Sequence, residues 1–302
     1  MIKNILAIRN DRFGEFLLNI PALRALKETY PDSRLTLAVN PSVKDLAECI
    51  EYADQIAVWD DDFKKSLRKY KFDLCVVLNP TKEAHVLSFL SGIPKRVGYD
   101  RKWGILLTHK IPDKKNLGLS HEVEYNLDLV GLIKARTSDK SISLSKLPVM
   151  ANPKYAGAVA IHPFTSDAVK QWPVERFQEL AKALSIQGDS HLRVLIVGKE
   201  EESGRKFDNL GNNIISLVNK TSLVELAQIL KQCKLLISCD SGPIHLAAAV
   251  GTQVIALFRN DLPGKTPHRW GPWGDKHIVI EKNSLSDIIV DEVLAKVKGI
   301  IR

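Results

Sequence analysis

Short apolar runs alternate with amphipathic segments along the whole chain, and this alternation predicts βαβ units around parallel sheets. In the first half, strands are expected at Ile5–Ile8, Leu35–Val39, Gln55–Val58, Leu74–Leu78 and Arg96–Gly98. The helices between and after them are expected near Phe16–Tyr30, Val43–Ile50, Phe63–Tyr70, Glu83–Leu90 and His121–Ile133.

The pattern lapses from Ala135 to Pro153, where Thr, Ser, Lys, Pro and Asn dominate, and then restarts. Further strands are expected at Ala158–Ile161, Arg193–Val197, Ile214–Leu217, Leu235–Ser238 and Val254–Phe258, and helices at Pro173–Leu184, Ser222–Lys231 and Pro243–Val250. We therefore expect two doubly wound α/β domains, 1–150 and 151–302, with the last helix able to return to the first. Ligands are expected in a cleft between them, at the carboxyl ends of strands.

Composition adds that the protein is an ordinary globular one: 302 residues, 45% hydrophobic and 26% charged, enough for two domains. The N-terminal apolar run is too short for a signal peptide. Ser241–Phe258 is uncharged for 18 residues, but Gly-Pro and Gly-Thr-Gln interrupt it, so a helix and a strand are expected there. The cysteines lie far apart or in apolar runs, with no CxxC pair, so we expect a cytoplasmic protein whose cysteines are reduced core residues. They are Cys49, Cys75, Cys233 and Cys239.

The net charge of +8 is concentrated in one segment. Between Gly92 and Asn116 there are seven Lys or Arg and two Asp, a net charge of +5 in 25 residues. Either this is a solvated loop or it docks an anionic partner, such as a phosphorylated glycan or lipid headgroups. Nucleic acid is disfavoured because the segment has no recognition-helix pattern.

The clearest candidate site follows a strand near the C-terminus. Leu235–Phe258, LLISCDSGPIHLAAAVGTQVIALF, predicts a strand, a turn and a helix. Ser241 or Asp240 can cap this helix, whose N–H groups and positive dipole end suit a diphosphate. His245 lies about one turn in, near enough to face a ligand. An ordinary strand-to-helix junction with a core histidine explains the same pattern.

Two other loops follow strands. In IHPFTSDAVKQWP, two hydroxyls and Lys170 make a phosphate clamp, unless this is a plain surface loop. In VGKEEESG, a carboxylate is placed to bind ribose hydroxyls, unless the glutamates only complement a helix dipole. Near the N-terminus, RNDRFGEF has one glycine and places Glu15 at the helix start, so it is a poor phosphate cradle. HExxH, GxSxG, GxGxxG and metal-spaced clusters are absent from the sequence, which disfavours hydrolases, metalloenzymes and NAD dehydrogenases.

Three of these stretches, in order along most of the chain, resemble glycosyltransferase family 9, the bacterial heptosyltransferases of the lipopolysaccharide core. They are RNDRFGEFLLNIPALRALKETYPDSRL, HPFTSDAVKQWPVERFQELAKAL and TSLVELAQILKQCKLLISCDSGPIHLAAAVGTQVIALF. The resemblance implies a GT-B fold of two Rossmann-like domains, with the acceptor in the first and the nucleotide sugar in the second. It implies transfer of a heptose from ADP-heptose to a lipopolysaccharide inner-core acceptor, inverting and without metal or cofactor, at the inner membrane's cytoplasmic face.

The resemblance also implies roles for individual residues. Glu15 is the expected general base, and Lys170 is expected to stabilise the departing diphosphate. The expected donor-binding residues are Thr165, Ser166, Lys170, Glu201 (with Glu200 as its rival), Asp240, Ser241, Gly242 and His245. The expected acceptor-binding residues are Arg12, Lys95, Arg96, Arg101 and Lys102.

Two positions depart from the family pattern. Glu15 stands where the family usually has aspartate, and Phe164 stands where it usually has glycine after His-Pro. Two alternatives therefore stay open. One is a GT-B transferase with another nucleotide sugar or acceptor, and the other is a relative that binds a sugar nucleotide without transferring it.

Overall fold

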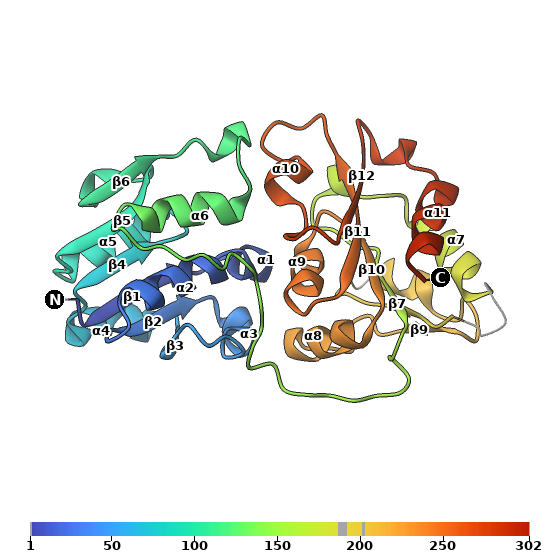
Figure 1. The fold of residues 1–302 in the computed structure, drawn as a ribbon, viewed down its shortest axis with the longest axis horizontal. Coiled ribbons are helices and arrows are strands. Elements are labelled where there is room, and N and C mark those ends of the chain that lie inside the picture. The colour runs from blue at the N-terminus through green and yellow to red at the C-terminus, as the bar shows by residue number, and fades with distance from the viewer. Residues whose placement is uncertain (1, 187–191, 201–202, 302) are drawn as a thin grey trace. The chain divides into compact units, whose positions relative to one another are not determined.

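The structure is a computed structural model that describes residues 2–186, 192–200 and 203–301. The chain divides into two compact units, Met1–Lys146 and Leu147–Arg302. Each unit has one parallel six-stranded sheet with helices packed against it (Figure 1).

In the first unit, the strand order is β3-β2-β1-β4-β5-β6, so the chain reverses its direction of winding between β1 and β4. The strands are β1 (Asn4–Arg9), β2 (Arg34–Val39), β3 (Gln55–Val58), β4 (Leu74–Val77), β5 (Lys95–Asp100) and β6 (His109–Pro112). The helices are α1 (Phe13–Leu17), α2 (Ile20–Thr29), α3 (Lys44–Ala47), α4 (Asp61–Ser66), α5 (Lys82–Leu90) and α6 (Glu122–Gly131). The unit also has four short 3₁₀ turns among its described residues: η1 (Pro41–Val43), η2 (Leu67–Tyr70), η3 (Gly104–Leu106) and η4 (Lys115–Leu117).

The second unit repeats this topology, with the order β12-β11-β10-β7-β8-β9 and the reversal between β7 and β10. Its strands are β7 (Val159–His162), β8 (Val194–Ile196), β9 (Ile214–Ser216), β10 (Leu235–Cys239), β11 (Gln253–Arg259) and β12 (Ile278–Lys282). Its helices are α7 (Val174–Ser185), α8 (Leu223–Gln232), α9 (Gly242–Ala249), α10 (Pro267–Trp270) and α11 (Val290–Ile301), with 3₁₀ turns η5 (Ala168–Lys170), η6 (Ser203–Phe207) and η7 (Leu285–Asp287).

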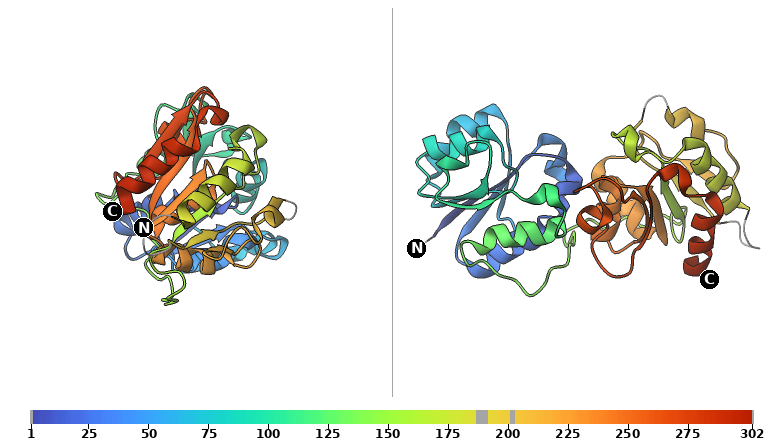
Figure 2. Two further views of the ribbon diagram at one scale, coloured as in Figure 1. Left: turned by 90° about the vertical axis from the view of Figure 1, so that its right-hand side faces the viewer. Right: turned by 90° about the horizontal axis from the view of Figure 1, so that it is seen from above.

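The central strands are buried on both faces, as a parallel sheet between helix layers requires. α7 shows how the helices cover the sheet: Phe177, Leu180, Ala181 and Leu184 recur at helical spacing and are all fully buried. α11 packs beside α7, as Figure 2 shows for the red and yellow-green helices. Side chains of Ser222 and Glu225 form a capping box that fixes the start of α8, with bonds of 3.2 and 2.7 Å.

The expected single helix near Phe16–Tyr30 is wrong, because it is two helices. Pro21 has no N–H to donate to the preceding turn and its ring crowds that turn, so a continuous helix is not available. The side-chain amide of Asn19 instead donates to the carbonyl of Glu15, at 2.6 Å. The break leaves Glu15 in a short helix of its own directly after β1.

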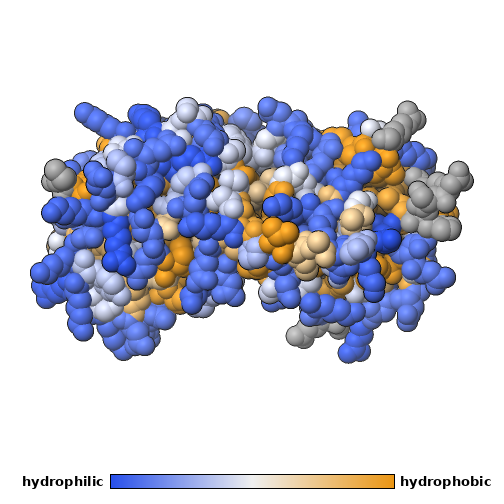
Figure 3. Space-filling model, turned by 60° about the horizontal axis from the view of Figure 1, so that its bottom comes forward, coloured by the Kyte–Doolittle hydropathy of each residue, from blue (hydrophilic) through white to orange (hydrophobic). Residues whose placement is uncertain are grey.

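β6 and β12 were not expected from the sequence. Both are edge strands with half-exposed side chains. β6 has no apolar run and ends in a proline, and the apolar run of β12 is only three residues long, Ile278–Ile280. The uncharged stretch near the C-terminus is α9 followed by β11, as expected. Among the described residues, no helix combines the length and apolarity needed to cross a membrane. In the space-filling view of Figure 3, hydrophilic residues cover most of the visible face and hydrophobic ones form separate patches.

Candidate functional site

The topological reversal in the second unit brings Lys170 and Asp240 together. β7 and β10 are hydrogen-bonded neighbours, with Ile161 opposite Ile237. Their carboxyl ends lead into η5 and into the turn before α9. There the Lys170 ammonium forms a hydrogen-bonded ion pair with the Asp240 carboxylate, both side chains being mostly buried. Ligands of doubly wound sheets bind at such a switch point.

The loop between β7 and η5 holds the two predicted hydroxyls. The Thr165 hydroxyl accepts a hydrogen bond from the backbone N–H of Asp167, at 3.2 Å, which fixes its orientation. Ser166 is exposed. The Asp167 carboxylate accepts from the N–H of Val169 at 3.2 Å and so caps the turn that ends at Lys170. The loop is therefore ordered by its own polar side chains.

The start of α9 is built differently from what the sequence suggested. Ser241 occupies the N-cap position, but its side chain makes no capping bond. Its hydroxyl instead donates to the carbonyl of Cys239 at 3.0 Å and is hydrogen-bonded to Ser238 at 2.9 Å. The expected capping by Ser241 is thus wrong, because the hydroxyl is held by its own turn. Gly242 and Pro243 follow as the first residues of the helix.

Two buried histidines belong to this region. His245 lies in the first turn of α9 and is 4% exposed. His162, at the end of β7, is hydrogen-bonded through Nδ1 to the Ser238 hydroxyl at 3.0 Å. Burial lowers the pKa of His162 to about 4, so this imidazole is neutral at physiological pH. It links β7 to β10, and its Nδ1 also lies 3.3 Å from the Ser241 hydroxyl in the turn before α9. The sequence did not assign this role to it.

Phe164 is turned into the core of the second unit. Its ring makes edge contacts with His162, at 5.9 Å between centroids, and with Phe207, at 5.8 Å. It fills the space beside Gly198, where a Cβ would lie 2.7 Å from Phe164 and 2.8 Å from His162. Gly198 also has a φ of +134°, which other residues rarely adopt. The Phe164 ring therefore fits because position 198 has no side chain.

The predicted ribose-binding residue, Glu201, lies outside the described residues. Its rival Glu200 lies inside them, in the loop after β8. The Glu200 N–H donates to the Asn219 side chain at 3.0 Å, and the Asn219 amide donates back to the Glu200 carbonyl at 2.8 Å. These two bonds hold the loop after β8 against the loop after β9.

In the first unit, Glu15 lies just beyond the carboxyl end of β1. Burial raises the pKa of its carboxyl group, and the nearby Asp11 carboxylate raises this pKa further. The guanidinium of Arg12, 3.2 Å away, lowers it and so partly opposes the shift. The side chain is 18% exposed, so it is accessible but largely removed from water. A carboxylate with a raised pKa is a stronger base than an exposed one.

Other polar side chains share this edge of the first sheet and were not assigned from the sequence. Arg9 is buried, pairs with Asp11 at 2.7 Å and donates to the carbonyl of Leu78 at 3.0 Å. The Asn79 amide donates to Asn10 at 3.2 Å. These residues follow β1 and β4, which lie on either side of the reversal. Their position directly after two predicted strands was the signal available in the sequence.

The expected acceptor-binding cations do not gather in one place. Lys95 and Arg96 are at the amino end of β5, while Arg101 and Lys102 follow its carboxyl end. The Arg96 guanidinium is occupied with the carbonyls of Ile93 and Leu106. Arg101 pairs with Asp113 at 3.0 Å. Arg12 pairs with Glu15 at 3.2 Å.

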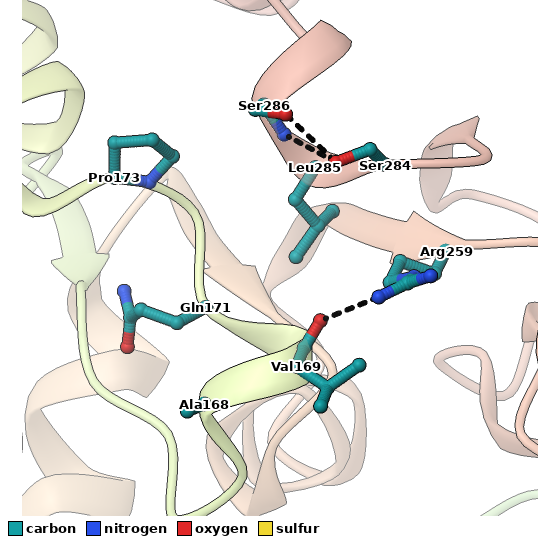
Figure 4. A pocket seen from close by; sticks show the side chains of 8 residues that line it. All are labelled: Ala168, Val169, Gln171, Pro173, Arg259, Ser284, Leu285 and Ser286. Atoms are coloured by element: carbon teal, nitrogen blue, oxygen red, sulfur yellow. Dashed lines mark hydrogen bonds between the residues drawn. The ribbon is translucent and has the colours of Figure 1, made fainter.

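A pocket of about 360 Å³ lies beside η5, on elements of the second unit, but contains none of the predicted site residues. Figure 4 shows Arg259 at one side of it, donating to the carbonyl of Val169 at 3.5 Å. Arg259 is also paired with Asp261 at 2.6 Å. The pocket is lined by Ala168, Val169, Gln171, Pro173, Arg259, Ser284, Leu285 and Ser286.

The sequence profile of glycosyltransferase family 9 (heptosyltransferase) matches residues 61–289. The chain belongs to this family. The match includes Lys170, Asp240 and the whole of α9, so this glycosyltransferase has its ion pair and helix start within the family's shared region.

Individual relatives agree with this assignment. A Haemophilus influenzae protein, to which glycosyltransferase activity is provisionally ascribed, is 26% identical over all of this chain and 97% of its own. Lipopolysaccharide heptosyltransferase 3 of Escherichia coli K12 is 27% identical over 88% of this chain and 84% of its own. The structure of E. coli ADP-heptose lipopolysaccharide heptosyltransferase II superposes with a TM-score of 0.80 at 21% identity, covering 99% and 98% of the chains. The fold is GT-B with two Rossmann-like domains, and the protein is a glycosyltransferase.

Within residues 2–186, 192–200 and 203–301, no three His, Cys, Asp or Glu side chains are grouped so as to hold a metal ion. All four cysteines are buried and unpaired with one another.

Proposed function

We propose that this glycosyltransferase moves a heptose from ADP-heptose to a lipopolysaccharide inner-core acceptor, with inversion at the anomeric carbon. The observation that carries the proposal is the Lys170–Asp240 pair at the β7/β10 switch point, in a chain of this family. An ammonium group held there by a carboxylate is placed where a nucleoside diphosphate binds in doubly wound sheets.

The donor is assigned to the second unit. Lys170 would exchange its bond to Asp240 for the donor's diphosphate, and Thr165 and Ser166 would donate to phosphate oxygens. The N-terminal end of α9, beginning at Gly242, adds positive potential for the same group. Asp240, Ser241 and His245 would line the sugar and diphosphate, and Glu201 would accept from the ribose hydroxyls.

Glu15 is assigned as the general base. It would accept the proton of the acceptor hydroxyl as that oxygen bonds to the anomeric carbon and the bond from that carbon to the diphosphate oxygen breaks. ADP leaves with the bonding electrons, and its growing negative charge is met by Lys170 and the α9 dipole without a metal ion. Attack from the face opposite the leaving group inverts the anomeric centre.

The acceptor is assigned to the first unit. It is a phosphorylated glycolipid, so the cations Arg12, Arg101 and Lys102 near the carboxyl edge of the sheet suit its anionic groups. Because such a lipid lies in a bilayer, the protein would work at the cytoplasmic face of the inner membrane.

A thermal-shift comparison of ADP, UDP and GDP tests the donor assignment. A nucleotide that binds only the folded protein stabilises it by about 2.7 kcal/mol at 100 times its Kd. We expect the midpoint temperature to rise most with ADP. We expect the rise to be lost in Lys170→Gln and kept in Lys206→Gln, a control on the exposed surface where Lys206 pairs with Glu175. A larger shift with UDP, or an unchanged ADP shift in Lys170→Gln, would refute the assignment.

A further inference from the structure

The helix that carries Glu15, α1, is too short to hold its own shape. It has five residues, Phe13–Leu17, and no side chain caps its start. A helix shorter than about 12–15 residues is only marginally stable by itself in water, so contacts from outside must fix this one. The carbonyls at the carboxyl end of a helix also need donors, because no further turn follows to supply them.

Two fully buried asparagine amides supply such donors to α1. Asn19, shortly after the helix, donates to the carbonyl of Glu15 at 2.6 Å. Asn126, in the middle of α6, donates through Nδ2 to the carbonyl of Leu18 at 3.2 Å, across 108 positions of the chain. Leu18 is the residue at which α1 ends. The carboxyl end of α1 is therefore fastened at two points, and the second comes from α6, which packs against α2 (Figure 1).

A buried ion pair determines which way the Asn126 amide faces. The Lys115 ammonium is hydrogen-bonded to the Glu122 carboxylate, and it also donates to Oδ1 of Asn126 at 3.4 Å. Both charged side chains are buried. An ammonium group can only donate, so it selects the amide oxygen, and the amide NH₂ is then turned to the carbonyl of Leu18. The ion pair therefore orients the hydrogen bond that holds α1.

Two aromatic rings keep the Lys115 ammonium in this place. Its Nζ lies 4.4 Å from the centre of the Tyr99 ring and 5.9 Å from that of the Tyr125 ring. The hydroxyl of Tyr99, on β5, donates to the carbonyl of Tyr125, on α6, at 2.7 Å. Contacts between a cation and an aromatic ring are strongest where water is excluded. The network therefore joins β5, η4 and α6 to the end of α1, all within the first unit.

We propose that Asn126 is a positioning residue which, with the Lys115–Glu122 pair behind it, sets where the carboxylate of Glu15 lies. The inference rests on the general-base role proposed for Glu15. Asn126 acts through the carbonyl of Leu18, about one helical turn after Glu15, and not through the substrates. Displacing a reacting group by about 1 Å can slow a reaction about 10²-fold, so proton transfer to Glu15 requires that α1 be held in place.

The kinetics of Asn126→Leu test the proposal, since leucine has nearly the same size and can form neither hydrogen bond. We expect kcat with ADP-heptose and truncated lipopolysaccharide to fall about 10- to 100-fold. The KM for ADP-heptose is expected to change by less than about twofold, because Lys170 and Asp240 belong to the second unit. Tyr30→Phe is the matched control: it removes a 2.9 Å hydrogen bond to the carbonyl of Ile133 in the same unit, and kcat is expected to stay unchanged.

A second measurement follows the Glu15 carboxyl group itself and does not depend on sugar transfer. Its titration is recorded by ¹³C NMR in protein labelled at the glutamate carboxyl carbons, and Glu15→Gln identifies its signal. Burial raises the pKa of this group, and Arg12, Asp11 and Arg9, the charged groups around it, stay in place in every variant. We expect Asn126→Leu to lower this pKa toward that of an ordinary glutamate, because a loosened α1 exposes the carboxylate to water.

Asn126→Asp is the second variant, used if the leucine variant does not fold. It keeps the contact with Lys115 but has no N–H for Leu18, so a similar loss of kcat is expected; folding of each variant is checked by thermal unfolding. A folded Asn126 variant with unchanged kcat and an unchanged pKa of Glu15 would overturn the proposal. Equal losses of kcat in Asn126→Leu and Tyr30→Phe would also overturn it. A lowered pKa of Glu15 in Asn126→Leu, with normal transfer by Glu15→Gln, would support the positioning and refute the base role.

Discussion

The carboxyl group of Glu15 shows how one position joins local structure to chemistry. Glu15 is the third residue of the short helix α1. This helix is separate from α2 because Pro21, in the first turn of α2, cannot continue a helix from α1. That helix places the carboxylate just past β1, largely out of water, where its pKa is raised by burial. A base in this state is poised to accept a proton rather than merely to carry a charge.

Replacing Glu15 by glutamine is expected to lower kcat by about 10²–10⁴, since the amide cannot accept the proton. Glu15→Asp is expected to retain part of the activity, because the carboxylate remains but is one methylene shorter. Transfer rates are measured with ADP-heptose as donor and truncated lipopolysaccharide as acceptor. Near-normal transfer by a folded Glu15→Gln protein would remove Glu15 from the base role.

The raised pKa of Glu15 also predicts two pH effects. The acid limb of the kcat/KM profile should lie above the pH at which an ordinary glutamate titrates, because the base must be ionised. The second effect concerns the free energy of unfolding. Because Glu15 ionises more easily in the unfolded chain, this free energy falls as pH rises from the pKa of Glu15 in the unfolded chain through its higher pKa in the folded protein. Glu15→Gln should therefore be at least as stable as the wild type in urea at pH 7. A less stable variant would contradict this account.

At the scale of elements, the loop after β8 and the end of β7 fit together at Gly198. Gly198→Ala would force a Cβ to 2.7 Å from Phe164 and into a left-handed backbone. We expect a loss of about 1–3 kcal/mol in the free energy of unfolding, measured by urea denaturation. Gly211→Ala is the control, since its Cβ meets nothing closer than 3.7 Å. Equal stability of the two variants would show that the contact with Phe164 is not tight.

Most central strands could be predicted, because each is a short apolar run bounded by polar residues. β1, β2 and β10 lie where those runs lie, within a residue or so at each end. The edge strands β6 and β12 were missed: β6 has no apolar run, and the run in β12 is only three residues long, Ile278–Ile280. The break at Pro21 had a signal, but the apolar pattern on both sides continued through it.

The candidate site residues remain predictions, and the contacts between them could not be predicted from the sequence. Lys170 and Asp240 were each chosen from their own loop, and only the adjacency of β7 and β10 brings them together across 70 positions. Asn10 and Asn79 were missed for the same reason, as they are 69 positions apart. The basic segment was overvalued as a single patch, because a count of charges does not show that Arg96 and Lys115 are taken up by internal partners.

At the scale of the whole molecule, the same strand order occurs twice with different chemistry at the switch point. In the first unit the edge carries a carboxylate and amides, namely Glu15, Asn10 and Asn79. In the second it carries an ammonium group and hydroxyls, at Lys170, Ser238 and Ser241. The function proposed above uses this difference: it assigns the general base to the first unit and the diphosphate site to the second.

The most direct test of this account is a transfer assay with ADP-heptose and truncated lipopolysaccharide acceptors, read by mass spectrometry. The account predicts an acceptor that gains the mass of one heptose residue, with release of ADP only when the acceptor is present. Transfer from a UDP- or GDP-sugar with none from ADP-heptose, or no acceptor-dependent release of ADP at all, would contradict it.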